Sequence, residues 1–172
     1  MTYQYTYKTK DGFSDIIMNS DGEYLTGLYF EESRDSMKKK TDTLEKDLPI
    51  FKETTQWLDI YFSGQIPNFT PKYKIENITP FRKEVIDIIN TIPFGKTITY
   101  GDISKKIAKN RGMKTMSSQA VGKAVGWNPI CIIIPCHRVI GANGSLTGYG
   151  GGLQNKIALL AHENNGMNKH SI

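Results

Sequence analysis

The chain has 172 residues, of which 38% are hydrophobic, and it carries a formal net charge of +5 with a pI of about 9.1. This length allows one or two small domains with cores of their own, and the mild basicity is compatible with a polyanionic partner without proving one. No run approaches the ~18 consecutive apolar residues of a membrane span, and the polar N-terminus does not resemble a signal peptide. We therefore expect a cytoplasmic protein without a membrane partner.

The two cysteines, Cys131 and Cys136, do not suggest a disulfide framework. They do not suggest a zinc site either, since no second Cys or Cys/His pair stands at ligand spacing. A reducing compartment, in which a reactive thiol survives, is the expected setting.

The first 30 residues predict short β-strands. Tyrosines alternate at positions 3, 5 and 7, and the turn pairs Asp11-Gly12 and Asp21-Gly22 precede further apolar runs. The charge-dense segment 31–47 predicts a surface loop. Its lysines 38–40 allow a phosphate contact, although a solvated loop is the simpler interpretation.

A helix is expected next, followed by a linker. Apolar and aromatic side chains recur at helical spacing before Ser63-Gly64, which predicts the end of the helix. These residues are Phe51, Thr54, Trp57, Leu58 and Tyr61. Residues 65–78, with two prolines, predict the linker. We therefore expect an N-terminal domain, residues 1–75, with a small β-sheet and a helix, and a C-terminal domain, residues 76–172.

The second half predicts several helices. Thr79-Pro80 combines a good N-cap with a proline in the first turn, and Pro93-Phe94-Gly95 predicts the end of that helix. One face of it is apolar, at Phe81, Val85, Ile88, Ile89 and Ile92. A closing helix from Leu153 to about Glu163 is expected to end at Asn164-Asn165-Gly166. Its predicted buried face is Leu153, Ile157 and Leu160.

Between these elements the sequence resembles a helix-turn-helix. Thr99 and Asp102 match a capping box that opens a helix to Lys109, and a break at 110–112 precedes a third helix, residues 117–126. This third helix presents mostly small side chains, at Ser117, Ser118, Ala120 and Gly122, beside Gln119 and Lys123. A helix face with small side chains can approach the sugar-phosphate backbone of DNA closely. Because such contacts do not read the bases, we expect sequence-independent DNA binding in the minor groove. The alternative is that alanine and glycine only permit tight helix packing.

A polar Cys136-His137 pair interrupts the apolar run 132–140. The isoleucines predict a buried strand, which the chain leaves at Pro135, so that Cys136 lies on a turn at the rim of the core. An adjacent imidazole is one way to raise the thiolate fraction of a cysteine. The alternative, an inert core cysteine with a hydrogen-bonded neighbour, stays open on the pair alone.

The run Pro135-Cys136-His137-Arg138-Val139, with Asn128-Pro129 before it, resembles the active-site signature of the O6-alkylguanine-DNA alkyltransferases. The resemblance extends from about Thr79 to Glu163 and is weaker in the N-terminal half, where Trp57–Phe62 and Gly64 carry it. Other matching motifs are Ile92-Pro93-Phe94-Gly95, Thr99-Tyr100, Ala120-Val121-Gly122, Tyr149 with its glycines, and Leu159-Leu160-Ala161-His162-Glu163. It implies a mixed α/β (α+β) fold, with a ribonuclease H-like N-terminal domain.

The resemblance also implies an activity, that of a methylated-DNA--protein-cysteine methyltransferase. Cys136 would take the alkyl group of O6-alkylguanine, with O4-methylthymine as a second candidate substrate, while Glu163 orients His137 and a water links His137 to the thiol. Asn128 would pin the turn, and Tyr100 would donate a hydrogen bond or a proton to the leaving base. The thioether has no good leaving group, so each molecule would act once. Arg138 is expected to be structural.

The implied partner is double-stranded DNA, from which the damaged nucleotide is rotated into a pocket framed by Val139, Tyr149 and Gly150. Two positions depart from the family. Many members carry arginine where this chain has Gln119, and some carry serine where it has Gly150. We expect slower base flipping with Gln119, and a backbone amide in place of the serine at Gly150. A monomer without metal or cofactor is expected, because the zinc-binding cysteines of some relatives are missing.

Two other classes of protein share some of these features. A non-catalytic lesion sensor or regulator would use the same helix-turn-helix, but sensors of that kind lack the reactive cysteine that is present at position 136. A cysteine hydrolase would need an oxyanion hole and would turn over repeatedly. Alkyl transfer to Cys136 is the function that the sequence favours.

Overall fold

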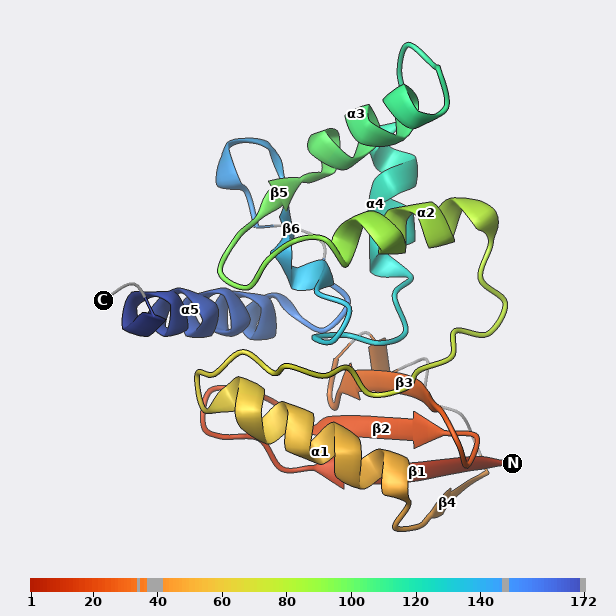
Figure 1. Cartoon of the computed structure of the whole chain (residues 1–172), viewed down its shortest axis with the longest axis vertical. Helices are drawn as coiled ribbons and strands as arrows, with labels where there is room; N and C mark the ends of the chain where they lie inside the picture. Colours follow the sequence, from red (N-terminus) through yellow and green to blue (C-terminus); the bar gives the residue numbers. More distant parts are fainter. Residues whose placement is uncertain (34, 37–41, 147–148, 171–172) are drawn as a thin grey trace.

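A computed structural model describes residues 1–33, 35–36, 42–146 and 149–170, with side chains as far as residue 164 (Figure 1). It has the mixed α/β fold that the sequence predicts, with two small sheets and five α-helices in the described residues. The elements of the N-terminal half are β1 (Thr2–Tyr7), β2 (Ile16–Ser20), β3 (Leu25–Phe30), β4 (Thr43–Glu45) and α1 (Pro49–Phe62). Those of the C-terminal half are α2 (Pro80–Ile89), β5 (Ile98–Thr99), α3 (Tyr100–Asn110), α4 (Ser118–Gly126), the 3₁₀ turn η2 (Cys136–Arg138), β6 (Val139–Ile140), the 3₁₀ turn η3 (Ala142–Gly144) and α5 (Leu153–His170).

The N-terminal sheet has the strand order β3-β2-β1-β4, and α1 lies across one of its faces (Figure 1). β2 pairs antiparallel with both β1 and β3, and β4 pairs with β1 in parallel. Ile16 and Met18 of β2 are completely buried, as are Leu28 and Phe30, their neighbours on β3. The alternate residues of β2 are buried as well, with Ile17 3% and Asn19 4% exposed, so both faces of this strand are covered.

The three helices α2, α3 and α4 pack against one another above the sheet (Figure 1). The predicted caps are present: the Thr79 hydroxyl accepts from the Arg82 amide, and Thr99 and Asp102 form a reciprocal capping box. These N-caps satisfy the first backbone amides of α2 and α3, which therefore begin where the sequence signals predict. None of the helices in the described residues is long and apolar enough to cross a membrane.

The two halves are joined along the open edge of β3. The Leu28 amide donates to the Pro129 carbonyl, and the Cys131 amide donates to the Leu28 carbonyl, both at 2.9 Å. The predicted linker also uses this edge, because Leu25 exchanges backbone hydrogen bonds with Lys72 and Lys74. Buried side chains of both halves form one continuous cluster. The division of the chain at residue 75 therefore stays a prediction.

The prediction of an apolar strand before Cys136 is wrong. Residues 131–134 form a buried turn, in which Ile132 has a positive φ of 68° and the Ile134 amide donates to the Ile130 carbonyl. An apolar run says that a segment is buried and does not say in which conformation. Here the neighbouring elements bury Ile132 and Ile134 and leave Ile133 half-buried, so these isoleucines need no sheet.

Two expectations about the ends of elements are also wrong. The segment predicted as a loop contains β4, and α5 continues through the expected stop at 164–166 as far as His170. The buried face of α5 differs as well, since Leu153 and Ile157 are 46% and 42% exposed. The side chains that α5 buries are Asn155, Lys156, Leu159 and Glu163. Lysines 38–40 lie outside the described residues.

Candidate active site

A small pocket contains Cys136 at the junction of the two halves. It is lined by Asp35, Tyr100, Val125, Gly126, Asn128, Cys136, Tyr149 and Gly150. Cys136 is the first residue of η2 and is 7% exposed, and the free volume beside it is about 10 Å³. Of the five predicted catalytic residues, Cys136, Tyr100 and Asn128 line this pocket, and His137 and Glu163 are buried in a network reached through η2.

Asn128 holds the turn that carries Cys136. Its side-chain amide donates to the Ile134 carbonyl, and its oxygen accepts from the Ile130 amide, both at 3.0 Å. One side chain therefore bridges the two ends of the turn, as the sequence leads us to expect. Because Asn128 is buried, losing either bond would leave a polar backbone group without a partner in the core.

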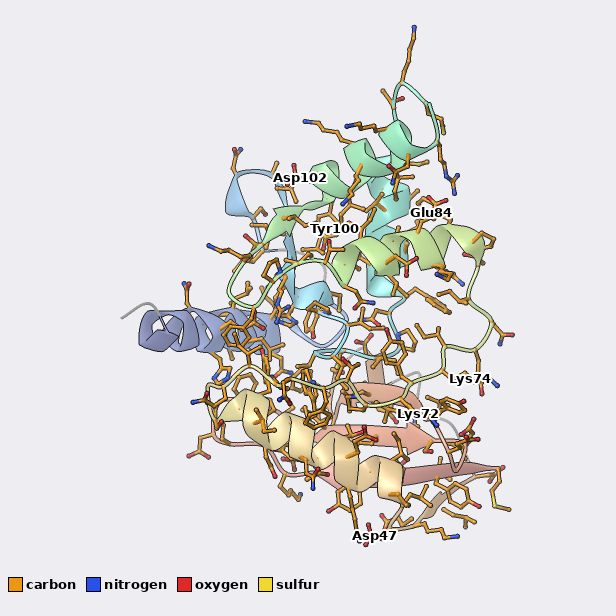
Figure 2. All side chains as sticks on the ribbon, in the orientation of Figure 1. Asp47, Lys72, Lys74, Glu84, Tyr100 and Asp102 are labelled. Carbon is orange, nitrogen blue, oxygen red and sulfur yellow. The ribbon has the colours of Figure 1, made fainter. Side chains whose placement is uncertain are left out.

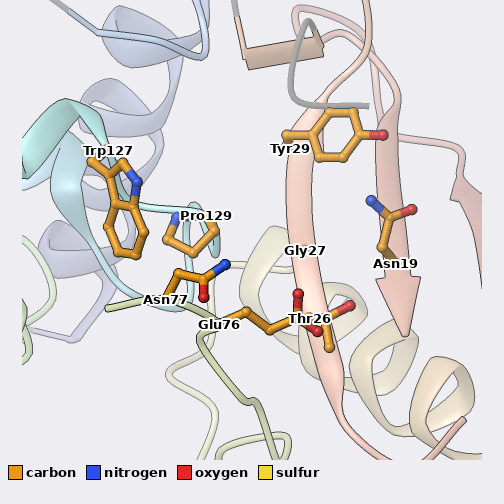
Figure 3. A pocket seen from close by; sticks show the side chains of 8 residues that line it. All are labelled: Asn19, Thr26, Gly27, Tyr29, Glu76, Asn77, Trp127 and Pro129. Atoms are coloured by element: carbon orange, nitrogen blue, oxygen red, sulfur yellow. The ribbon is translucent and has the colours of Figure 1, made fainter. Parts of the chain in front are cut away.

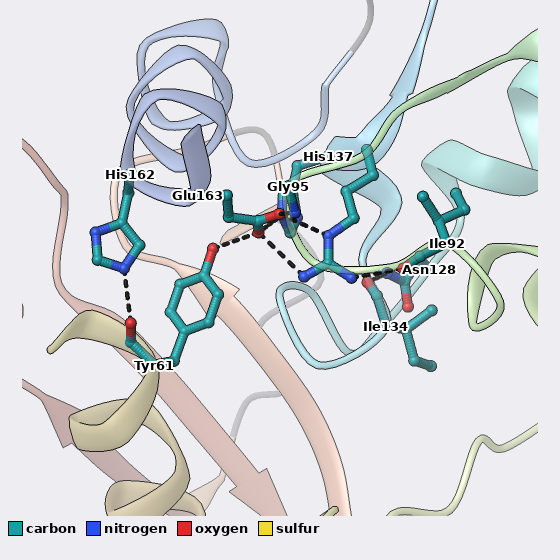
Figure 4. A network of polar contacts seen from close by, with 9 residues as sticks. Tyr61, Ile92, Gly95, Asn128, Ile134, His137, His162 and Glu163 are labelled. Carbon is teal, nitrogen blue, oxygen red and sulfur yellow. Dashed lines mark hydrogen bonds and ion pairs between the residues drawn. The ribbon is translucent and has the colours of Figure 1, made fainter. Parts of the chain in front are cut away.

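Glu163 is the centre of a buried polar network (Figure 4). Its carboxylate accepts from His137 Nε2 at 2.5 Å, from the Tyr61 hydroxyl at 2.6 Å and from the Gly95 amide at 3.1 Å. The Arg138 guanidinium donates to both carboxylate oxygens, at 2.7 and 3.2 Å, and also to the Ile92 carbonyl at 2.8 Å. A carboxylate that is 1% exposed is thus paired with a cation and surrounded by donors, which is what a buried charge requires.

These surroundings set the protonation states. Burial by itself raises the pKa of Glu163, but His137 and Arg138 outweigh it and hold the pKa of this carboxyl well below its usual range. Burial, with the nearby charges of Arg138 and Lys156, lowers the pKa of His137 below its ordinary value, although the Glu163 carboxylate raises it. Burial and Glu163 together raise the pKa of the Tyr61 hydroxyl well above its usual range, so Tyr61 stays a donor. At neutral pH the network is an ionised Glu163 with a neutral His137.

A neutral His137 has one ring nitrogen that can accept a proton. The short contact with Glu163 assigns the N–H to Nε2, which leaves the lone pair on Nδ1. Nδ1 is buried and has no hydrogen-bond partner among the described residues. His137 and Glu163 are therefore arranged so that His137 Nδ1 can accept a proton while the Glu163 carboxylate stabilises the ring through Nε2.

Two residues of the site were missed from the sequence. Tyr61 comes from α1 of the N-terminal half, more than 100 positions from Glu163, and its helical spacing predicted only that it is buried. Lys156 is completely buried, donates to the Val139 carbonyl at 2.7 Å, and has its pKa lowered by burial. Its spacing of seven positions before Glu163 places the two on one helix face, which was the available signal.

The residues predicted to contact DNA lie mostly on the exposed side of α4. Ser117 is the N-cap and accepts from the Ala120 amide, and the side chains of Gln119 and Lys123 are exposed. The other predicted members are Ser118, which is exposed and contacts Ser104, and Ala120 and Gly122, which are half-buried.

Gly122 adjoins the pocket. A Cβ at this position would lie 3.9 Å from the ring of Tyr100, so α4 packs directly against that side chain. Tyr100 itself starts α3, at the end that carries Asp102 (Figure 2). The small-residue face of α4 and the Cys136 pocket are therefore neighbours. Of the remaining predicted pocket residues, Tyr149 and Gly150 line the pocket and Val139 is buried in β6.

A larger cavity, of about 330 Å³, lies between β3 and the segment before the Cys136 turn (Figure 3). Its walls include Asn19 and Gly27 on the sheet side and Trp127 with Pro129 on the other. None of the predicted site residues lines it. Across the described part of the chain, no three His, Cys, Asp or Glu side chains are placed to hold a metal ion.

The buried His137 should make the fold sensitive to acid. Its folded pKa lies below the ordinary value of 6.5, so the unfolded chain binds a proton first as the pH falls, and stability is lost below about pH 6.5. We expect His137 to contribute a slope of at most about 1.4 kcal/mol per pH unit to the free energy of unfolding. Urea unfolding at pH 7.5, 6.5 and 5.5 measures it. A His137→Asn variant should show a shallower slope than a His162→Asn control, and equal slopes would contradict the assignment.

Comparison with known proteins agrees with this geometry over nearly the whole chain. Residues 80–165 match the model of the 6-O-methylguanine DNA methyltransferase DNA-binding domain, and residues 2–73 match that of its ribonuclease-like domain. A methylated-DNA--protein-cysteine methyltransferase of Methanosarcina mazei is 40% identical, with 95% of this chain and 99% of the relative covered.

Solved structures show the same likeness. Mycobacterium tuberculosis OGT in complex with DNA superimposes with a TM-score of 0.80 at 35% identity, covering 95% of this chain and 94% of that one. The O6-methylguanine-DNA methyltransferase of Pyrococcus kodakaraensis gives a TM-score of 0.66 at 25% identity, over 95% and 99% of the two chains. Sequence and structure thus agree from β1 to α5, and the chain belongs to the 6-O-methylguanine DNA methyltransferase family.

Proposed function

We propose that this protein repairs DNA by transferring the alkyl group of O6-alkylguanine to its own Cys136, once per molecule. The observation that carries the proposal is the position of Cys136 in a pocket next to a buried proton acceptor. This acceptor is the neutral His137 imidazole, which is hydrogen-bonded to the ionised Glu163. Membership of the methyltransferase family supports the same reaction.

The reaction balances with groups that the site contains. The Cys136 thiol gives up its proton toward His137 Nδ1, through a bridging water, and Sγ attacks the alkyl carbon in line with the C–O6 bond. As the S–C bond forms, the C–O6 bond breaks and its electron pair goes to the guanine. Tyr100, at the pocket wall, donates a hydrogen bond or a proton to the leaving base. Arg138 and Tyr61 keep Glu163 in place and ionised, and so support the charge that forms on His137.

The thioether that forms is stable, because an alkyl thiolate is a poor leaving group and no group in the pocket is proposed to displace it. The protein is then a reagent consumed by its one reaction. No cofactor is needed, since the substrate itself supplies the alkyl group. O4-methylthymine is a second candidate, because it carries an O-alkyl group that the same thiol can attack.

Damaged double-stranded DNA is the proposed partner. The reacting carbon lies within a stacked duplex, so the nucleotide must rotate out to reach a buried thiol. The exposed, small-residue face of α4 beside Tyr100 supports sequence-independent binding through the sugar-phosphate walls of the minor groove. Gln119 is exposed on this face and would occupy the space left by the flipped base. A cytoplasmic monomer fits this role.

The two rival functions make different demands on Cys136. A lesion sensor needs the helices but no thiol in the pocket, and a hydrolase needs repeated turnover. The placement of Cys136 beside the Glu163–His137 base favours alkyl transfer over the sensor.

Mass spectrometry of the intact protein tests the alkyl transfer directly. We expect incubation with duplex DNA containing one O6-methylguanine to add the mass of one methylene group to the intact protein, at Cys136 and no more than once per molecule. Cys136→Ser should abolish the gain, whereas Cys131→Ser, which removes the other buried thiol, should retain it. Repeated turnover, or an unmodified and reactive Cys136, would rule out the proposal.

Gln119 should limit base flipping, since glutamine hydrogen-bonds an orphaned base without contributing a charge. Gln119→Arg is expected to raise the rate constant of transfer on duplex DNA and to leave the rate on the free base O6-methylguanine unchanged. Lys123→Arg, which conserves the charge on the same helix, is the control. Equal duplex rates for wild type and Gln119→Arg would argue against a flipping role.

Tyr61 should act by positioning Glu163. Tyr61→Phe removes a hydrogen bond to a buried carboxylate and is expected to cost about 1.5–3 kcal/mol of stability. It should also lower the transfer rate on the free base. Tyr7→Phe is a matched control, because it removes a tyrosine–carboxylate bond, to Asp59, that is outside the Glu163 network. If both variants lose stability and neither loses rate, Tyr61 has no part in the reaction.

A further inference from the structure

A loop with three consecutive glycines, residues 149–152, forms one wall of the Cys136 pocket, to which it supplies Tyr149 and Gly150. We call this segment the glycine loop. Glycine loses more conformational freedom on folding than any other residue, so a loop of this composition has many conformations open to it unless other groups hold it. The shape of the pocket therefore depends on the groups that fix the glycine loop.

Two hydrogen bonds hold the peptide group between Gly151 and Gly152. The Gly152 amide donates to the Tyr149 carbonyl at 3.1 Å. The Gly151 carbonyl, on the opposite side of the same peptide group, accepts from the side-chain amide of Asn155 at 2.7 Å. Because a peptide group is planar, fixing both its carbonyl and its amide fixes its orientation. Asn155 thus supplies one of the two bonds that orient this part of the loop.

Asn155 also connects the glycine loop to the N-terminal half. It lies in the first turn of α5 and is 7% exposed. Its side-chain oxygen accepts from the Ser14 amide, in the β1–β2 loop, at 3.2 Å. Both ends of the side-chain amide are therefore engaged, and rotating it would leave buried polar groups without partners. One side chain joins α5, the glycine loop and the β1–β2 loop.

The glycine loop packs closely where Asn155 holds it. A Cβ at Gly151 would lie 2.5 Å from the ring of Tyr149 and 3.0 Å from the ring of Phe30, closer than side-chain atoms normally approach. The backbone at Gly151 thus lies directly against Tyr149, whose side chain lines the Cys136 pocket. A shift of the Gly151 carbonyl would therefore change the wall that a base must meet.

We propose that Asn155 is a positioning residue for alkyl transfer, which holds the glycine loop in the conformation that receives the flipped base. This inference rests on the proposed function. Asn155 does not line the pocket, so it acts through the loop. When the loop is in place in only a fraction of the molecules, occupation of the pocket by the base falls with that fraction. Binding of DNA through the exposed face of α4 does not depend on it.

Asn155→Asp separates the two hydrogen bonds of this side chain. A carboxylate still accepts from the Ser14 amide but cannot donate to the Gly151 carbonyl. It is also favourable in the first turn of a helix, so α5 should be retained. We expect the rate constant of methyl transfer at saturating O6-methylguanine duplex, measured by intact mass, to fall about tenfold, the factor that corresponds to one hydrogen bond of about 1.4 kcal/mol. Asn155→Ala should lower the rate constant in the same way.

Two further measurements distinguish positioning of the loop from damage to the thiol or the fold. The affinity for undamaged duplex, measured by fluorescence anisotropy, should be unchanged. The rate at which iodoacetamide alkylates Cys136 should not fall, because this small reagent needs no base pocket and the Glu163–His137 pair is intact.

Two control variants complete the test. Asn19→Ala removes a buried asparagine of β2, outside the glycine loop, and should leave the transfer rate unchanged. Gly151→Ala, whose Cβ displaces the loop, should lower the transfer rate as Asn155→Asp does. The double variant should show no further decrease, because the loop is already out of place.

The possible results separate this proposal from the proposed function. Equal transfer rates in the wild type and both Asn155 variants overturn the positioning role and leave the proposed function standing. A parallel fall of the transfer rate and the iodoacetamide rate also overturns it, since the substitution then acts on the thiol. A wild-type protein that reacts with iodoacetamide but takes no methyl group from O6-methylguanine overturns both.

Discussion

The buried carboxylate of Glu163 is the interaction on which the rest of the structure depends. A charge taken out of water is tolerated only when it is paired and hydrogen-bonded. Glu163, a residue of α5, meets this requirement with groups from three other segments: Tyr61 of α1, the Gly95 amide of the α2–β5 loop, and His137 and Arg138 of η2. Satisfying one charge therefore aligns α1, α5 and the segment that carries Cys136.

The site is built where the halves meet, and each half contributes chemistry. The edge of β3 holds the segment that leads into the Cys136 turn, and Asn128 closes that turn from within. The N-terminal half also provides Tyr61, which donates a hydrogen bond to Glu163, and Asp35, which lines the Cys136 pocket. The N-terminal half thus completes the site, although its sequence contains no motif for chemistry.

The errors of sequence interpretation in the closing helix and in the apolar run share one cause. On α5 the apolar positions Leu153 and Ile157 predicted the buried face, yet the helix buries Lys156 and Glu163 instead. A periodicity rule assumes that burial follows hydrophobicity, and it fails where buried polar groups are paired with one another. The strand predicted from the isoleucines before Cys136 was also wrong, because burial by neighbouring elements permits a turn as well as a strand. Both departures lie at the functional site.

The sequence by itself determined the mixed α/β class, most of the helices with their caps, the family resemblance and the candidacy of Cys136, His137 and Glu163. These follow from local signals, namely spacing, turn residues and a motif of consecutive positions. Only the tertiary structure decided that Arg138 and Tyr61 compensate Glu163, that Lys156 is buried, and that Asp35 reaches the pocket. The physical reason is that such pairings depend on which distant segments the fold brings together, and a buried charge selects its partners in space, without regard to their separation along the chain.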